Sequence, residues 1–189
     1  MAVLSRSAGL LLSGLLLSCS VGVGEGEASG LVTAPDCGLE GREFNLRPDF
    51  FVADEFEDQL EIRMQNGGDY EFLSNGIAIY VDDVEIEEAR LGTPIPLSAE
   101  AGAPIRMTLY LHKRCIFDRD VPPVHYVAAE GTITFEDIFA PDFDDDRRIA
   151  GRFDDVRFVD TSRPEERFAL FSGNFDFLFN RGRPAQRFP

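Results

Sequence analysis

Three aspartates near the middle of the second half of the chain have a spacing that could bind a metal ion. Asp142, Asp144 and Asp146 alternate with other residues, and this spacing lets a loop surround a hard cation with oxygen ligands. Arg147 and Phe153 stand where a complete EF-hand loop has its glycine and its bidentate glutamate. Two interpretations therefore remain: a calcium site at the three aspartates, or a solvated acidic loop whose charge is balanced by nearby arginines. No other cofactor is indicated.

Two histidines are the side chains best suited to proton transfer at neutral pH. His112 falls at a polar position of an alternating stretch, and His125 follows a pair of prolines. Neither has a nucleophile or a carboxylate partner visible in the sequence, and the chain has no GxSxG, HExxH, Walker or dinucleotide-binding motif. We therefore predict no catalytic residue, and an active site would have to be assembled from residues far apart in sequence.

The N-terminal residues have the layout of an export signal. Arg6 precedes an apolar core of about ten residues, which as a helix would be about 15 Å long and too short to span a bilayer. The core ends at Leu16-Leu17-Ser18-Cys19, which resembles the lipobox of bacterial lipoprotein precursors. This resemblance implies a signal peptide over residues 1–18, cleavage before Cys19, and lipidation of Cys19. The alternative is an ordinary secretory signal with a chance cysteine near its end.

The same resemblance implies attachment to the bacterial cell envelope. Several acyl chains on Cys19 would anchor the protein almost irreversibly, since each buried methylene contributes about 0.8 kcal/mol. Ser20 rather than aspartate follows the cysteine, which by similarity to the sorting rule of enteric bacteria favours the outer membrane. Residues 19–36 are rich in Gly, Ser, Ala and Glu, and they indicate a flexible tether before a domain of residues 37–189.

Cys37 and Cys115 remain once Cys19 carries a lipid. In an oxidising compartment, two remaining cysteines of an exported domain most simply form a disulfide. On the chain-entropy model a bridge of this span restrains the unfolded state by roughly 4 kcal/mol. Two free thiols or a metal-bound pair are the alternatives, although the chain has no CxxC pair.

Acidic residues dominate the chain. It has 34 acidic and 18 basic residues and a formal charge of −16, which becomes −17 without residues 1–18 because Arg6 is their only charge. Such a field repels nucleic acid and anionic lipid headgroups, so we expect neither as an electrostatic partner. Basic partners or divalent cations fit the charge better. Contact with the membrane is expected through the lipid on Cys19, and the protein or glycan partner is not identified by the sequence.

Alternation of apolar and polar residues is the main structural signal from Phe44 onward. It predicts strands over Gln59–Gln65 and Ile105–Leu111. Asn75-Gly76 is typical of a two-residue hairpin turn, and Asp82–Leu91 fits either a short helix or a further strand. In the last third of the chain the strand-like pieces are residues 131–138, 148–153, 156–160 and 168–179.

These short strands predict an all-β domain, an antiparallel β-sandwich, with a small β-barrel as the alternative. Phenylalanines at alternating positions between Phe171 and Phe179 are expected to supply much of the core. The segments GTITF, IAGRF and FSGNFD, which begin at residues 131, 149 and 171, look like the repeated strand pattern in β-rich bacterial lipoproteins of unassigned function. That resemblance supports the fold and implies no mechanism.

Two function classes follow from these features. The first, which the sequence favours, is a lipid-anchored, non-catalytic domain of the bacterial envelope that binds or scaffolds a partner. The second is a small envelope hydrolase with a dispersed active site. The two differ in their need for His112 and His125, because only the hydrolase would depend on a titratable side chain of this kind.

Overall fold

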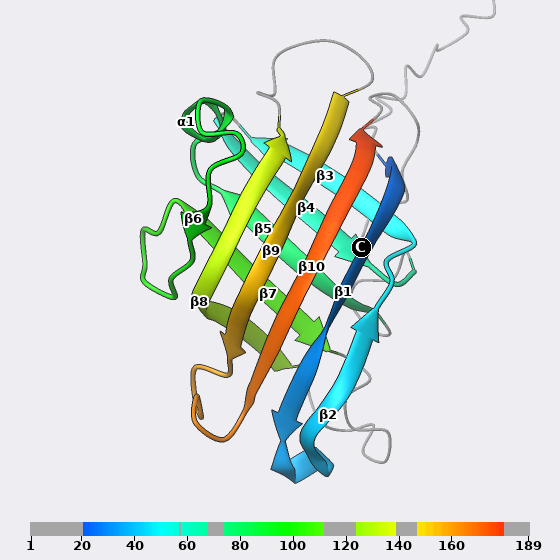
Figure 1. Ribbon diagram of the computed structural model, residues 1–189, viewed down its shortest axis with the longest axis vertical. Helices are drawn as coiled ribbons and strands as arrows, with labels where there is room; N and C mark the ends of the chain where they lie inside the picture. Colours follow the sequence, from blue (N-terminus) through cyan, green and yellow to red (C-terminus); the bar gives the residue numbers. More distant parts are fainter. Residues whose placement is uncertain (1–20, 57, 68–73, 112–123, 139–146, 180–189) are drawn as a thin grey trace, which may run out of the picture.

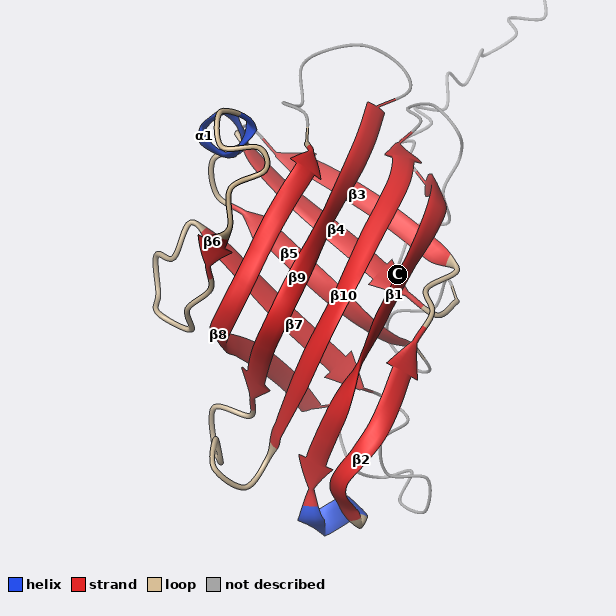
Figure 2. Ribbon diagram, in the orientation of Figure 1, coloured by secondary structure: helices blue, strands red, loops and turns tan. Residues whose placement is uncertain are grey.

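A computed structural model shows an all-β protein, which confirms the fold class predicted from the sequence (Figures 1 and 2). The structure describes residues 21–56, 58–67, 74–111, 124–138 and 147–179. In these ranges the elements are β1 (Val21–Ala34), the 3-10 turn η1 (Pro35–Cys37), β2 (Leu39–Leu46), β3 (Phe50–Phe56), β4 (Gln59–Gln65), β5 (Asn75–Val81), α1 (Val84–Glu88), β6 (Ile95–Pro96), β7 (Ile105–Leu111), β8 (Val124–Asp137), β9 (Arg147–Val159) and β10 (Phe168–Phe179).

The described strands close into a barrel, so the alternative prediction is supported and the sandwich is not confirmed. Eight antiparallel strands follow one another in the order β1, β3, β4, β5, β7, β8, β9 and β10. The first and last strands then pair along most of their length, from Gly22 opposite Phe179 to Thr33 opposite Phe168. A sandwich would leave two separate sheets with free edges, whereas this pairing joins the two ends of one sheet.

The barrel is flattened into two crossing layers. In Figure 1, β8, β9, β10 and β1 lie side by side in front, and β3, β4, β5 and β7 cross behind them. The front strands have 12 to 14 residues and form what we call the long-strand sheet; the back strands have seven residues each and form the short-strand sheet. β2 pairs with the second half of β1, and the two-residue β6 pairs with β8.

Apolar side chains from all eight barrel strands fill the space between the two layers. Aromatic rings supply much of this core, as the sequence predicted: Phe171 lies edge-on to Phe158, and Phe177 stacks on Phe51 at 5.3 Å between ring centroids. Barrels of eight strands are narrow enough for side chains to fill them. The largest fully buried side chains of this core include Phe51, Tyr126, Phe135, Phe153, Phe158, Phe171, Phe175 and Phe177.

Residues 21–34 form β1, so the prediction of a flexible tether over 19–36 is wrong for this stretch. The glycines that suggested a tether occupy alternate positions of the strand that face the neighbouring phenylalanines. A Cβ on Gly22 would collide with the ring of Phe177, and a Cβ on Gly24 would collide with the backbone of Asp176 and Phe177. The glycines therefore make room for the aromatic core, and the folded domain begins at β1 instead of at Cys37.

Asn75 and Gly76 lie inside β5, which corrects the predicted hairpin turn. Gly76 is opposite Gln65 of β4 and Tyr110 of β7, so its backbone belongs to the middle of the sheet. A Cβ on Gly76 would collide with the phenol group of Tyr110. Glycine is present at this position because an aromatic side chain from the next strand covers it, a pairing known to compensate glycine in sheets.

The ambiguous stretch after β5 contains the short helix α1. Asp83 caps it, because its side chain accepts a hydrogen bond from the backbone N–H of Ile86 at 3.1 Å. Beyond the helix, the N–H of Gly92 donates to the carbonyl of Phe135 on β8 at 2.8 Å. Residues 84–97 therefore cover the part of β8 that β7 does not reach.

Glu87 of α1 is a buried carboxylate. Its Oε1 accepts a hydrogen bond from Arg90 at 3.2 Å, while its Oε2 is buried and has no hydrogen-bond partner among the described residues. Burial raises the pKa of Glu87, and this effect exceeds the lowering by Arg90. The folded protein therefore carries an electrostatic cost at this helix when Glu87 is ionised.

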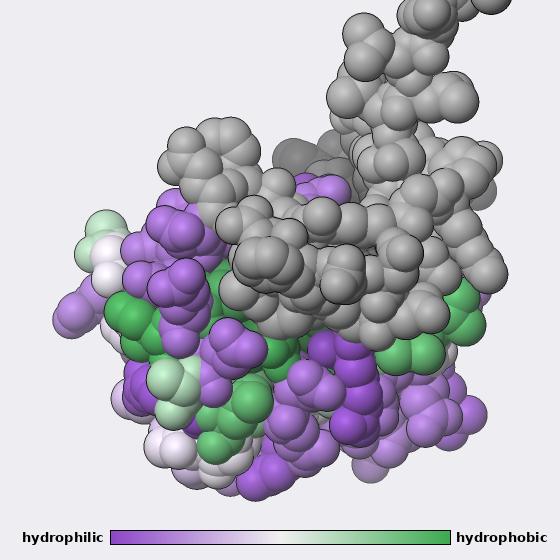
Figure 3. Space-filling view, turned by 90° about the horizontal axis from the view of Figure 1, so that it is seen from above, coloured by the Kyte–Doolittle hydropathy of each residue, from purple (hydrophilic) through white to green (hydrophobic). Residues whose placement is uncertain are grey.

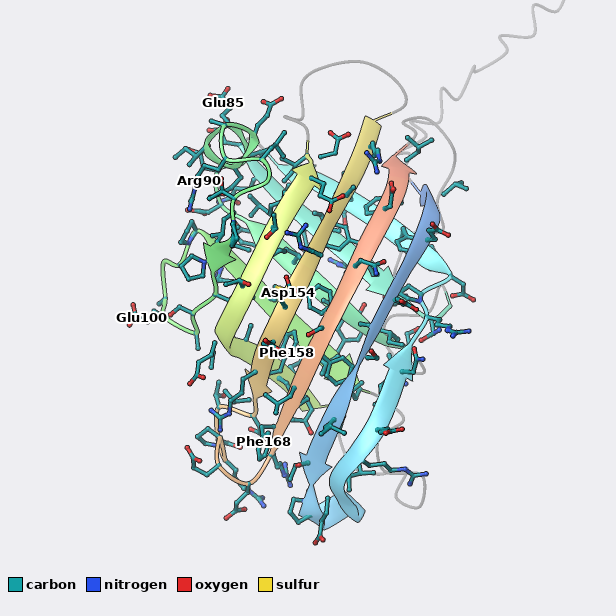
Figure 4. The ribbon with its side chains drawn as sticks, in the orientation of Figure 1. Glu85, Arg90, Glu100, Asp154, Phe158 and Phe168 are labelled. Atoms are coloured by element: carbon teal, nitrogen blue, oxygen red, sulfur yellow. The ribbon has the colours of Figure 1, made fainter. Side chains whose placement is uncertain are left out.

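β9 contains a bulge, which explains why the sequence predicts two separate strand pieces, over residues 148–153 and 156–160. Asp155 has a φ of 50° and donates its N–H to Ser172 at 3.0 Å, and the pairing with β10 skips one residue here. Asp154 and Phe158 are four residues apart and would share a face of a regular strand, but Asp154 is exposed and Phe158 is buried (Figure 4). The bulge thus shifts the alternation by one position.

Arg167 links the turn after β9 to η1. Its guanidinium lies between two carboxylates, with Nη1 3.1 Å from Asp160 Oδ2 and Nη2 in contact with Asp36. Asp160 also accepts hydrogen bonds from the N–H and the hydroxyl of Ser162, at 2.9 and 2.6 Å. Burial alone would raise the pKa of Asp160, but the hydrogen bonds from Ser162 and Arg167 outweigh it and lower this pKa.

Candidate functional site

Two of the residues singled out in the sequence lie in the described part of the chain. Cys37 is the last residue of η1, and His125 is an exposed residue of β8. The described residues contain no group of three or more His, Cys, Asp or Glu side chains arranged to hold a metal ion. The lipidation, disulfide and calcium assignments therefore stay predictions. The remaining predicted residues lie outside the described ranges: Cys19, His112, Cys115, Asp142, Asp144 and Asp146.

The outer face of the short-strand sheet has a shallow hollow of about 370 Å³. We call it the tyrosine–arginine hollow. Its walls and floor come from four adjacent strands, β4, β5, β7 and β8, which hold it in the most regular part of the sheet. It is lined by Glu61, Ala78, Tyr80, Arg106, Thr108 and Val127.

Strand register explains why a hollow forms here. Glu61, Tyr80 and Arg106 form one row across β4, β5 and β7. Ala78 and Thr108 lie in the next row, and both are too short to fill the space that the longer side chains leave. Large side chains thus surround a floor of small ones.

Tyr80 and Arg106 form the wall of the hollow. The guanidinium carbon of Arg106 lies 4.1 Å from the centre of the Tyr80 ring, which is a cation–π contact. Such a contact contributes about 0.5–1 kcal/mol at an exposed site, and it leaves the hydrogen-bond donors of the guanidinium at the ring edge. The pair therefore offers a flat surface with polar groups at its margin.

A second arginine, Arg63, lies in the same row as Ala78 and is paired with carboxylates. Arg63 donates from Nε to Glu61 at 2.6 Å and lies 4.0 Å from Asp54. Burial raises the pKa of Asp54, Arg63 opposes this effect, and Glu61 adds to it. The hollow thus combines an aromatic–cation stack with balanced charges of both signs.

Tyr110 and Gln65 lie in the row next to Ala78 and Thr108, where both are opposite Gly76. Both are buried although they lie on the outer face; the Tyr110 hydroxyl donates to Gln65 Oε1 at 2.8 Å, and Gln65 Nε2 donates to the carbonyl of Gly67 at 2.7 Å. His125 is opposite Tyr110, with 6.4 Å between the ring centroids. The only histidine in the described ranges therefore lies one row away from the floor of the hollow, beside the hydrogen-bonded pair of Tyr110 and Gln65.

A second hollow, of about 490 Å³, lies between β1 and β2. Its aromatic residue is Phe44, whose ring packs towards Phe171 of the core at 6.1 Å and is only partly available to a ligand. Its remaining lining residues are Ser29, Gly30, Leu31, Glu43 and Asn45. This hollow offers a ligand less aromatic and cationic surface than the first.

The sequence contained the residues of the tyrosine–arginine hollow but not their proximity. Arg63, Tyr80 and Arg106 each occupy a polar position of an alternating strand, which indicates the outer face and nothing more. Their grouping depends on which strands pair and in which register, and alternation alone does not give either.

Among the described residues, no helix has the length and apolar character needed to cross a membrane. No family model, no curated protein and no solved structure matches this chain.

Proposed function

We propose that the protein is a lipid-anchored, non-catalytic domain of the bacterial envelope that binds a protein or glycan partner through the tyrosine–arginine hollow. The observation that carries the binding part is the stack of Arg106 on Tyr80 above a floor of small residues. Tyrosine and arginine are the residue types that contribute most to binding at protein interfaces, and aromatic faces also suit sugar rings.

The form of the hollow favours binding over catalysis. It is open and shallow, and Arg106 is exposed to solvent. Catalytic electrostatics depend on a site from which water is excluded, because charges in contact with water are screened. The described barrel interior, where water is excluded, is filled by the apolar core.

The lipid anchor is supported by the lipobox at Leu16-Leu17-Ser18-Cys19. Mass spectrometry of the N-terminal peptide from membrane fractions should find Cys19 as the first residue, with acyl groups attached. Cys19→Ser should give an unprocessed or soluble protein. A cleaved Cys19→Ser protein that stays with the membrane would contradict the anchor.

The binding surface can be tested with a photo-crosslinking residue in the full chain in intact cells. At Thr108, on the floor of the hollow, it should give a discrete adduct, and Arg106→Ala should remove that adduct. The matched control position is Asn174, which is exposed on the outer face of β10. Adducts of the same kind from both positions, or an adduct at Thr108 that survives Arg106→Ala, would refute the assignment of the hollow.

A further inference from the structure

One end of the barrel exposes large apolar side chains. We call it the N-terminal end; it is where β1 begins and β10 ends. Val23 of β1 and Leu178 of β10 are directly opposite each other there, and they are 67% and 49% exposed. Ile86 of α1 is also exposed, and α1 lies at this end of the molecule (Figure 1). Figure 3 looks onto the same end and shows apolar residues among hydrophilic ones around its rim.

The expected lipid anchor belongs to the same end. Cys19 precedes the first residue of β1, Val21, by two positions. An extended chain spans at most about 3.6 Å per residue, so the Cα atoms of Cys19 and Val21 are within about 7 Å of each other. Because Val21–Ala34 is a strand of the barrel, little chain remains to hold the domain away from the headgroups.

We propose that the N-terminal end of the barrel contacts the bilayer, with Val23 and Leu178 in the headgroup region. This inference rests on the lipid anchor in the proposed function. The anchor brings the two side chains to the surface, and their burial in the interface then fixes the orientation of the barrel.

Charge near this end selects the kind of lipid. Asp176 is neutralised by Arg148, whose guanidinium donates to both its carboxylate oxygens at 2.8 and 2.6 Å. Glu25 lies opposite Asp176, and no ion pair with another described residue neutralises it. With a formal charge of −17 on the chain from Cys19 onward, the surface fits zwitterionic headgroups and is repelled by anionic ones.

The opposite end of the same two strands provides a matched control. Leu31 of β1 and Leu170 of β10 are also directly opposite each other and are 43% and 42% exposed. Leu170 and Leu178 share a strand and an outer face but are about 26 Å apart along β10. Only Leu178 should reach the bilayer.

Tryptophan fluorescence can test this orientation, because the chain has no tryptophan. Leu178→Trp and Leu170→Trp, each in the lipidated full chain, are inserted into phosphatidylcholine vesicles that contain lipids brominated near the headgroup end of one acyl chain. Emission from Leu178→Trp should fall at least twofold, and emission from Leu170→Trp should change little. Replacing a third of the phosphatidylcholine with phosphatidylglycerol should weaken the quenching.

Separate outcomes distinguish this proposal from the one it rests on. A lipidated chain in which both tryptophans are quenched equally, or neither is, overturns the orientation alone. A chain without lipid on Cys19 overturns the anchor and the orientation together. If Leu178→Trp does not fold, Val23→Trp tests the same contact from the opposite strand, where the side chain is more exposed.

Discussion

Alanine substitutions along β1 should show that this glycine-rich stretch is a packed strand. A Cβ on Gly24 or on Gly30 would lie well under 3.0 Å from backbone atoms of β10, and a Cβ on Gly26 would lie 2.9 Å from the carbonyl oxygen of Asn174. Backbone atoms cannot rotate away as a side chain can, so the strand must shift. Gly24→Ala and Gly30→Ala should therefore be more damaging than Gly26→Ala.

The size of the effect follows from two opposing contributions. Overpacking of a well-filled region costs about 1–3 kcal/mol, and the reduced freedom of the unfolded chain returns about 0.4–1 kcal/mol for Gly→Ala. We take the upper part of the first range for Gly24 and Gly30, which leaves a net loss of about 2 kcal/mol. In a domain of this size that loss lowers Tm by about 4–8 °C. For Gly26 the two contributions nearly cancel.

Thermal denaturation followed by circular dichroism measures this difference. The protein should be a soluble form that begins at Ser20, so that the whole of β1 is present. Ser29→Ala is the control, because Ser29 is exposed on the outer face of the same strand. Substitutions at surface sites change stability by about ±0.5 kcal/mol, which corresponds to about 1 °C in Tm. If Gly24→Ala and Gly30→Ala melt within this range of the control, β1 is not packed and the tether interpretation of residues 19–36 is restored.

Three further predictions concern stability and redox state. Thiol labelling of the unfolded, unreduced protein from the envelope should find neither Cys37 nor Cys115 free, and two reactive thiols would refute the disulfide. Glu87→Met should raise the unfolding free energy by about 1 kcal/mol at pH 7 by removing an unsatisfied buried oxygen. Because the pKa of Glu87 is raised, its protonated form is favoured in the folded state, and the gain should shrink as the pH falls towards 4; an equal gain at both values would contradict this reasoning. Asp160→Asn should lower the unfolding free energy by about 2 kcal/mol at pH 7. This is less than the loss expected on breaking an isolated buried ion pair, because Arg167 keeps its contact with the carboxylate of Asp36. The pKa of Asp160 is lowered, so this stabilisation is present above about pH 4 and is lost as the pH falls through the folded-state pKa; acid titrations of both proteins should therefore converge at low pH.

The sequence predicted individual strands better than their assembly. The predicted strands over Gln59–Gln65 and Ile105–Leu111 are confirmed with the same bounds, because each has one apolar and one polar face. Alternation carries no information on which strands pair, so the closure of the barrel and the grouping of Tyr80 with Arg106 could not be predicted.

The wrong predictions of a tether over residues 19–36 and of a hairpin turn at Asn75-Gly76 share one physical cause. The backbone freedom of glycine predicts a coil for residues 19–36 and a turn at Gly76, whereas in the structure Gly22 and Gly76 leave space for an aromatic ring from the adjacent strand. The ring that needs the space is far away in sequence, at Phe177 for Gly22 and at Tyr110 for Gly76. The residues next to these glycines in the sequence therefore favour a coil or a turn, because they do not include the ring that occupies the space.

Pairing between the first and last barrel strands has a consequence for the order of folding. Gly22 and Phe179 are partners although they are 157 positions apart in the sequence, so the contact can form only after β10 has been synthesised. Contacts at such separation form late, since the entropy of the intervening chain must be lost first. Until then the edge of β1 that pairs with β10 is open, and its glycines have no side chains with which to form an apolar core. The export proposed above would therefore carry the chain across the membrane before β1 and β10 can pair, and the pairing of these two strands closes the barrel.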